Sequence, residues 1–201
     1  MPVRSKVPFY NGIYFLTFTC YNWLSLLQKT NAYDLVYKWF DCLKESGSYI
    51  IGYVIMPNHL HAVIAFSDNE QSINTQVGNG KRFLAYGIVE QLKEQNDQDI
   101  LAILEKGVNA TDRKRGKLHA VFKASFDCKE CFSDKMLKTK LDYMHRNPCR
   151  GKWDLVNNPI DYIHSSAKYY YTGEQGYYPV THYLEIRDID LNKMSNMKMR
   201  K

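Results

Sequence analysis

The sequence Y-I-I-G-Y-V-I-M-P-N-H-L-H-A-V-I-A-F, residues 49–66, holds two apolar segments separated by a short break. The first segment, Tyr49–Met56, is a continuous apolar run of the length of a buried strand. Pro57 and Asn58 interrupt it, and both residue types are typical of turns. The second segment, His59–Phe66, resumes the extended pattern. We therefore predict two neighbouring strands joined by a tight turn.

The flanking sequence alternates between strand and helix patterns. β-Branched and aromatic residues predict a strand at 12–21, and apolar residues at helical spacing predict a helix that ends at Gly47, with Thr30 or Asn31 as its N-cap. The further predicted elements are, in chain order, a helix that opens after Gly78-Asn79-Gly80, a short helix at 100–104, a charged loop at 111–117, a strand at 120–126, and a helix that Ser133 caps and Pro148 ends.

The order strand-helix-strand-strand-helix-strand, with a further helix, predicts the fold class. It is typical of an α+β domain of the ferredoxin-like or RRM-like kind: an antiparallel sheet with helices packed on it, plus a tyrosine-bearing C-terminal helix. No linker rich in Pro, Gly or Ser divides the 201 residues, so we expect one domain over 1–201. From about residue 151 the sequence is rich in Asn, Pro and Tyr without a clear period, which predicts a mostly irregular extension.

The composition favours a folded, basic protein. Hydrophobic residues make up 45% of the chain, enough for a core, and the formal net charge of +6 favours a polyanionic partner. The N-terminus lacks the apolar run of a signal peptide and no apolar stretch is long enough to cross a bilayer, so we expect a cytoplasmic protein outside the membrane. The five cysteines should then stay reduced. The C-x-x-C pair Cys128 and Cys131 supplies only half of a structural zinc site, and we interpret it as two thiols near a strand end.

Two histidines begin the second strand of the apolar pair. Side chains alternate along a strand, so His59 and His61 point to one face, while the apolar residues between and after them point to the other. At this spacing both imidazoles can bind one metal ion, each through a ring nitrogen. The pair alone fits two surface or hydrogen-bonded histidines without a metal equally well.

A tyrosine and an asparagine share one side of the helix that ends at Pro148. At about 100° per residue, Tyr143 and Asn147 lie about 40° apart, next to an apolar stripe formed by Leu137, Leu141 and Met144. This spacing presents a phenol and an amide together. The same two residues also fit a tyrosine at the edge of the core and an asparagine that ends a helix before proline.

Three motifs occur in order along the chain. They are M-P-N-H-L-H-A-V-I at 56–64, D-Y-M-H-R-N-P at 142–148 and D-Y-I-H-S-S-A-K-Y-Y at 161–170. Together they resemble the single-tyrosine HUH transposases of small insertion sequences, with the REP-associated tyrosine transposases as the nearest group. The resemblance covers the chain from about residue 10 to residue 178, and three ordered motifs are much more specific than any one of them.

The resemblance implies an RRM-like catalytic domain, a DNA transposase and endonuclease that cleaves and rejoins single-stranded DNA. It implies His59 and His61 as metal ligands, and Tyr143 as the nucleophile that forms a 5′-phosphotyrosine. Asn147 would complete the metal site, where relatives from insertion sequences carry a glutamine. The sequence V-F-K-A at 121–124 also departs from the family pattern ahead of the tyrosine helix, and this departure concerns DNA recognition.

The implied cofactor is a divalent metal ion and the implied partner is single-stranded or hairpin DNA. Mixed imidazole and amide ligation suits Mn²⁺ better than Mg²⁺, and we expect either ion to serve. Six basic residues are predicted to contact phosphates, namely Arg113, Lys114, Arg115, Lys117, Arg146 and Arg150. Trp153, Tyr162 and the tyrosines at 169–171 could stack on unpaired bases, although core packing is favoured for the tyrosines. A monomer and a homodimer with exchanged helices both remain open.

Two other functions fit parts of the pattern. An RRM-like domain with a basic surface can bind single-stranded nucleic acid without catalysis, and Tyr143 then has no chemical role. A small zinc hydrolase would need a third ligand beside the two histidines and would form no covalent DNA adduct. The candidates for that ligand are His119, Cys128 and His145. Neither alternative accounts for all three motifs together.

Overall fold

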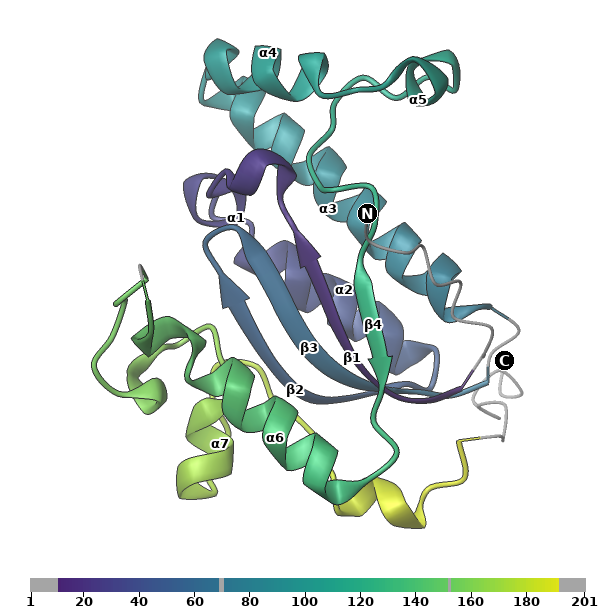
Figure 1. The fold of residues 1–201 in the computed structure, drawn as a ribbon, viewed down its shortest axis with the longest axis vertical. Helices are drawn as coiled ribbons and strands as arrows, with labels where there is room; N and C mark the ends of the chain where they lie inside the picture. The colour runs from purple at the N-terminus through teal and green to yellow at the C-terminus, as the bar shows by residue number, and fades with distance from the viewer. Residues whose placement is uncertain (1–10, 69–70, 152, 192–201) are drawn as a thin grey trace.

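A four-stranded antiparallel sheet forms the centre of the computed structural model, which describes residues 11–68, 71–151 and 153–191 (Figure 1). The strand order is β2-β3-β1-β4. The strands are β1 (Gly12–Thr19), β2 (Tyr49–Met56), β3 (His59–Phe66) and β4 (Asp127–Glu130). Helix α2 (Tyr33–Glu45) connects β1 to β2, and helix α3 (Ile73–Glu94) lies between β3 and β4 in the chain. Two split βαβ units therefore interlock, and the predicted ferredoxin-like α+β class is confirmed.

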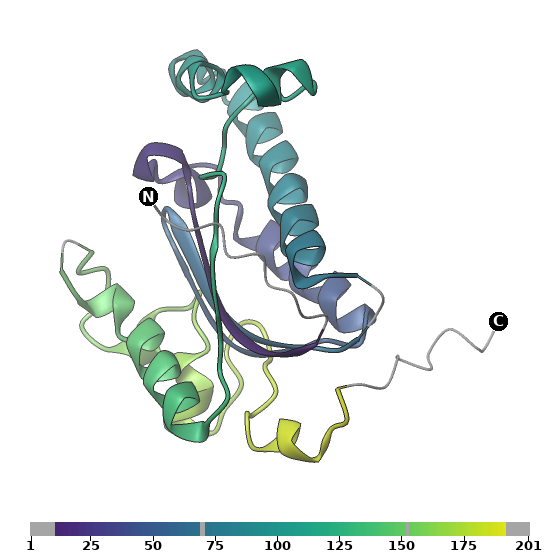
Figure 2. The same cartoon turned by 45° about the vertical axis from the view of Figure 1, so that its right-hand side comes forward.

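The sheet separates two layers of helices (Figure 2). Helices α2 and α3 cover one face, over a large core that includes Leu60, Ala62, Ile64 and Phe66 of β3. Helix α6 (Asp134–His145) covers the other face, over a smaller core that includes Val63 and Ala65 of the same strand. Because successive strand residues point to opposite faces, His59 and His61 share the face of Val63 and therefore lie under α6.

The short helices surround this framework. They are α1 (Leu26–Lys29), α4 (Gln98–Lys106), α5 (Ala110–Lys114) and α7 (Ala167–Thr172), with 3₁₀ turns η1 (Tyr21–Trp23), η2 (Asn147–Cys149), η3 (Pro159–Asp161) and η4 (Glu185–Asp188). Helices α4 and α5 lie beyond one end of the sheet (Figure 1). In the described residues, no helix combines the length and the apolar character that a bilayer crossing requires.

The predicted fourth strand is wrong in position. The alternating segment 120–126 joins the sheet only through an isolated bridge between Cys20 and Phe122, past the end of β1. The strand that pairs with β1 is β4, the next four residues. Three of these four are exposed, as is common for edge strands, which use polar residues to discourage pairing with other chains.

Three other local predictions are also wrong. Helix α3 begins at Ile73, where the Ser72 hydroxyl accepts the Thr75 amide hydrogen, so Gly78 and Gly80 lie inside the helix instead of before it. The N-cap of α2 is Ala32, because the Thr30 hydroxyl instead donates to the carbonyl of Leu26. Residues 111–114 of the predicted charged loop at 111–117 belong to the short helix α5.

The extension after residue 151 covers the outer edge of β2. The amide of Ile55 donates to the carbonyl of His164 at 2.9 Å, and the amides of Ser166 and Thr181 donate to β2 carbonyls at 3.0 and 2.9 Å. The hydroxyls of Tyr162 and Tyr170 donate to two more β2 carbonyls, at 2.8 and 2.9 Å. These tyrosines thus pack on the sheet. The extension is largely irregular in backbone, but its hydrogen bonds fix it to the domain.

The two thiols of the C-x-x-C pair are free and belong to different cores. Cys128 lies in β4 and packs against the core on the α2 and α3 side, while Cys131 packs against the core under α6. Burial raises the pKa of Cys128 to about 12, which opposes thiolate formation. The interpretation as two thiols near a strand end is confirmed.

Candidate active site

Asn58, in the turn between β2 and β3, fixes the first histidine. Its side chain is fully buried, and its Nδ2 donates to the carbonyl of Trp23 at 2.8 Å. Its Oδ1 then lies 2.7 Å from Nδ1 of His59. Because an amide oxygen only accepts, Nδ1 of His59 donates the hydrogen of this bond. The turn thus fixes the orientation of the imidazole.

His61 is oriented by its neighbours on β1. Thr17 lies directly opposite it in the strand register, and the Thr17 hydroxyl is 2.6 Å from Nδ1 of the imidazole. The imidazole also stacks on Phe15, with ring centroids 5.4 Å apart. Burial, followed by the charges of His59 and Lys140, lowers the pKa of His61 to about 3. His61 is therefore neutral at physiological pH, the state that a metal ligand requires.

Helix α6 brings the tyrosine to the histidines. The Ser133 hydroxyl caps its first turn by accepting the Met136 amide hydrogen, as the sequence predicted. The helix approaches β2 closely at Gly52, where an added Cβ would lie 2.5 Å from side-chain atoms of Leu141 and Met144. We therefore expect this contact to set the height of the tyrosine side of the helix above the sheet.

Tyr143 lies edge-on to His61, with ring centroids 5.4 Å apart. The two histidine rings are themselves 4.8 Å apart. The tyrosine is 50% exposed, whereas each histidine is only 6% exposed, so the histidines lie at the bottom of a cleft and not on an exposed strand face. A phenol at the rim and two imidazoles at the base form one compact group.

The cleft has a volume of about 460 Å³ and is lined by all four residues predicted for the catalytic and metal sites. Its complete lining is Phe15, Thr17, Thr19, Trp23, His59, His61, Asp127, Lys129, Lys140, Tyr143, Asn147 and Trp153. Although Pro148 ends the helical pattern and Asn147 begins the 3₁₀ turn η2, its side chain still borders this cleft.

The residues of the cleft fit a divalent metal ion. His59, His61 and Asn147 offer two imidazole nitrogens and an amide oxygen from neighbouring elements. Across the described ranges, no group of three His, Cys, Asp or Glu side chains could hold a metal, so a metal site in this cleft would need the amide as its third protein ligand.

The third ligands considered for a zinc hydrolase lie elsewhere. Nε2 of His145 is 2.8 Å from the hydroxyl of Ser166, in a buried contact between α6 and the start of α7. His119 borders a different groove, and Cys128 packs in the core on the far side of the sheet. The geometry therefore gives no support to a zinc site with three His or Cys ligands.

Several residues of the cleft were missed by sequence reasoning. Lys140 precedes Tyr143 by three residues, a helical spacing that puts both on one side, and this signal could have identified it. Thr17 could not have been found from periodicity alone, since it reaches His61 only through the pairing of β1 with β3. Trp23 projects into the cleft from a turn with left-handed backbone, which no sequence pattern indicated.

None of the six predicted phosphate-contacting residues lines the cleft. Arg113 contacts Glu105, Lys117 lies 3.3 Å from Asp112, and Arg146 lies 2.7 Å from Asp142 on its own helix. Lys114 and Arg150 are exposed. Arg115 and Lys117 border a second groove, between α3 and the segment before β4. Of the aromatic residues considered for stacking, Trp153 is the one that lines the cleft.

Comparison with solved structures supports the fold. No protein-family model and no curated protein matches the sequence. The structure is similar to that of a REP-associated tyrosine transposase bound to a REP hairpin, with 14% sequence identity, 93% of this chain and 91% of that chain covered, and a TM-score of 0.54. It also matches a candidate transposase from Deinococcus radiodurans R1, with 13% identity, coverage of 69% and 92%, and a TM-score of 0.35. The chain therefore has a tyrosine-transposase-like fold.

Proposed function

We propose that this protein is a metal-dependent transposase that nicks single-stranded DNA and rejoins it through Tyr143. The observation that carries the proposal is the edge-on contact of Tyr143 with His61 in one cleft that His59 and Asn147 also line. An accessible nucleophile beside two oriented imidazoles is the arrangement that a metal-assisted attack on phosphorus needs. The fold shared with a REP-associated tyrosine transposase supports the same assignment.

The reaction begins with attack of the Tyr143 hydroxyl oxygen on the scissile phosphorus. A bond forms between this oxygen and phosphorus, the bond from phosphorus to the 3′ oxygen breaks, and the phenolic proton leaves to solvent. The 3′ oxygen takes up a proton, so the products are a 5′-phosphotyrosine and a free 3′-OH. Attack of another 3′-OH on the phosphotyrosine reverses these steps and joins strands without ATP.

A divalent ion held by His59, His61 and Asn147 would supply Lewis-acid polarisation of the phosphate. The surrounding residues prepare this site. Asn58 and Thr17 contact the two imidazoles at their Nδ1 atoms, which fixes the orientation of each ring. Such contacts typically raise metal affinity by about 10- to 100-fold.

Lys140 gives the cleft a second cation. Its Nζ lies 4.8 Å from the ring centroid of Phe15, on the same side of α6 as Tyr143, and its charge contributes to the lowered pKa of His61. A positive charge in this place stabilises both the phenolate and the approaching phosphate. Trp23 and Trp153, on the side of His59, offer flat surfaces to the neighbouring bases.

The test is cleavage of short labelled single-stranded oligonucleotides with Mn²⁺ or Mg²⁺. We expect His61→Ala to reduce cleavage by at least 100-fold. The protein should stay folded, because the His61 side chain lies outside the large core. His182→Ala, which changes the same residue type away from both the cleft and the groove that His119 borders, is the matched control and should cleave normally. Cleavage at the wild-type rate by His61→Ala, or full activity in excess chelator, would remove the metal from the mechanism.

A noncatalytic single-strand binding module is the competing function, and this experiment separates it from the transposase. Such a module would bind the oligonucleotides at any metal concentration and leave them intact. We therefore expect metal to be required for cleavage but not for binding.

A further inference from the structure

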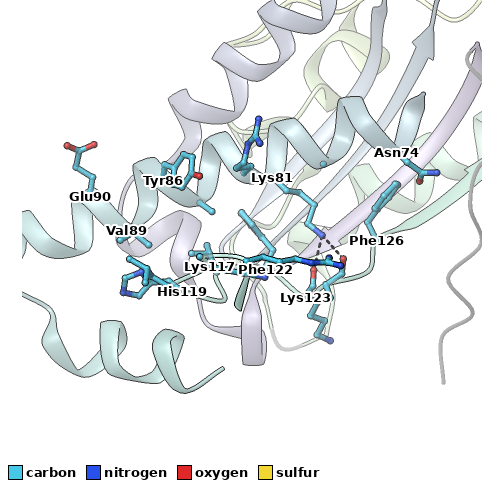
Figure 3. Close-up of a pocket in the computed structure, with 18 of the residues that line it drawn as sticks. Asn74, Lys81, Tyr86, Val89, Glu90, Lys117, His119, Phe122, Lys123 and Phe126 are labelled. Carbon is cyan, nitrogen blue, oxygen red and sulfur yellow. Dashed lines mark hydrogen bonds between the residues drawn. The ribbon is translucent and has the colours of Figure 1, made fainter. Parts of the chain in front are cut away.

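A second groove lies between α3 and the segment 115–126, outside the candidate active site (Figure 3). Its volume is about 920 Å³, and we refer to it as the α3 groove. Lys81 crosses from the helix to this segment, where its Nζ donates to the carbonyls of Lys123, Ala124 and Ser125 at 2.8, 3.4 and 3.3 Å. The position of the segment relative to the helix is therefore fixed by hydrogen bonds.

The α3 groove carries a large excess of positive charge. One carboxylate, Glu90, lines it together with six cations, which are Lys81, Arg82, Lys93, Arg115, Lys117 and Lys123. Of these cations, Lys117 is the one with an ion pair among the described residues, to Asp112. Burial, together with nearby Lys93, lowers the pKa of His119 and keeps this groove residue neutral. A polyanion would neutralise the remaining charges.

Apolar and aromatic side chains accompany these cations. Tyr86 projects from α3 and is 70% exposed, and Leu118 on the opposite segment is 65% exposed. Phe126, which is half-buried, contributes ring surface to the same groove, whereas Phe122 in its lining is buried. Cations interleaved with aromatic rings are typical of surfaces that bind single strands, where phosphates contact the cations and bases stack on the rings. A paired duplex presents its phosphates outward and keeps its bases stacked inside, so it cannot use this apolar lining.

The α3 groove meets the active-site cleft at one pair of residues. Nζ of Lys123, which lines the groove, lies 4.1 Å from the ring centroid of Trp23, which lines the cleft. Trp23 is 53% exposed, and its ring lies 6.4 Å from that of His59. A strand that leaves the cleft past His59 thus reaches the α3 groove by crossing an exposed aromatic ring and a lysine.

We propose that the α3 groove binds unpaired nucleotides that flank the scissile phosphate, with Trp23 and Lys123 at the junction. This inference rests on the proposed function and adds a location for the flanking strand. A short oligonucleotide would occupy only the cleft, and a longer one would occupy the cleft and the groove.

The test is fluorescence anisotropy in chelator, so that no strand is cut, with unpaired oligonucleotides of about 5 and about 15 nucleotides. We expect Arg115→Glu and Tyr86→Ala each to weaken binding of the long strand by about tenfold or more and to leave binding of the short strand within about twofold. The matched controls are Lys38→Glu, an exposed lysine on α2, and Phe132→Ala, an aromatic residue that is 83% exposed near α6. Neither control should change the affinity for either strand.

Photocrosslinking gives an independent readout. A long strand with 5-iodouracil near one end should crosslink to peptides that contain Tyr86 or Trp23. The proposal would be overturned if both groove variants bound the long strand with unchanged affinity, or if the groove variants and the controls lost affinity equally. The positive charge of the groove would then serve another anionic partner. Failure of the catalytic proposal would appear differently, as intact DNA in the presence of metal while the difference between long and short strands persists.

Discussion

Gly52→Ala tests whether the close packing of α6 on β2 positions the nucleophile. The added Cβ would lie 2.5 Å from Cδ2 of Leu141 and from Cε of Met144, about 1 Å closer than ordinary carbon contacts. The clashing atoms are the ends of flexible side chains, but both side chains are buried, so we expect the clash to be relieved in part by movement of the helix away from the sheet. Overpacking of this kind costs about 2 kcal/mol in the free energy of unfolding, or about 4–8 °C in Tm for a domain of this size.

The same movement should affect cleavage more than binding. A displacement of about 1 Å between a nucleophile and its target can reduce the rate by about 100-fold. We would measure Tm by calorimetry and the rate of covalent adduct formation with a short oligonucleotide. Wild-type stability together with a wild-type rate in Gly52→Ala would refute the argument that this contact sets the height of Tyr143.

Two further variants control the experiment on Gly52. Gly78→Ala, on α3, has no atom within 4 Å of the added Cβ and should stabilise the protein by up to about 1 kcal/mol through helix propensity. Leu141→Ala removes one of the clashing atoms, so it should cost less stability in the Gly52→Ala background than in the wild type. Additive losses in the double variant would show that the two positions do not meet.

Two remaining predictions concern the histidines. Thr17→Val removes the hydroxyl that lies 2.6 Å from Nδ1 of His61. It should weaken Mn²⁺ binding by about 10-fold or more, as measured by calorimetry. Unchanged affinity would mean that this contact does not orient His61. Burial lowers the pKa of His61 to about 3 and that of His145 to about 4, so below pH 6.5 the unfolded chain takes up protons that the folded protein does not. When the pH falls from 7.5 to 5.5, these two residues should lower the free energy of unfolding of the metal-free protein by about 3 kcal/mol. His145→Gln should remove about half of this pH dependence. Chemical denaturation at each pH would measure both effects.

The parts of the fold that the sequence predicted best are those with strong local patterns. Strands β2 and β3 have the predicted bounds, because an apolar run on each side of Pro57 and Asn58 leaves few alternatives. Helix α6 also follows its pattern from the Ser133 cap to the region of Pro148. Periodicity alone could not show that the histidines of β3 and the tyrosine of α6 belong to one site. The three ordered motifs indicated that they do.

The errors arise where long-range contacts decide the structure. Gly78 and Gly80 look like helix breakers, yet α3 continues through them, and a side chain at Gly80 would collide with Trp39 of α2. Strand β4 is short and polar, so its pattern is weaker than that of the preceding segment 120–126, and only pairing with β1 identifies it. The cleft residue Thr17 was missed for the same reason, because strand register is not visible in the sequence.

The most direct test of the central claim is to locate the DNA on the protein after cleavage. The protein is incubated with a single-stranded oligonucleotide and Mn²⁺, denatured, digested and analysed by mass spectrometry. We expect a nucleotide 5′ phosphate on Tyr143, absent in Tyr143→Phe but present in Tyr171→Phe, which changes an exposed tyrosine on α7. An adduct on another tyrosine, or cleavage by Tyr143→Phe at the wild-type rate, would contradict the proposed mechanism.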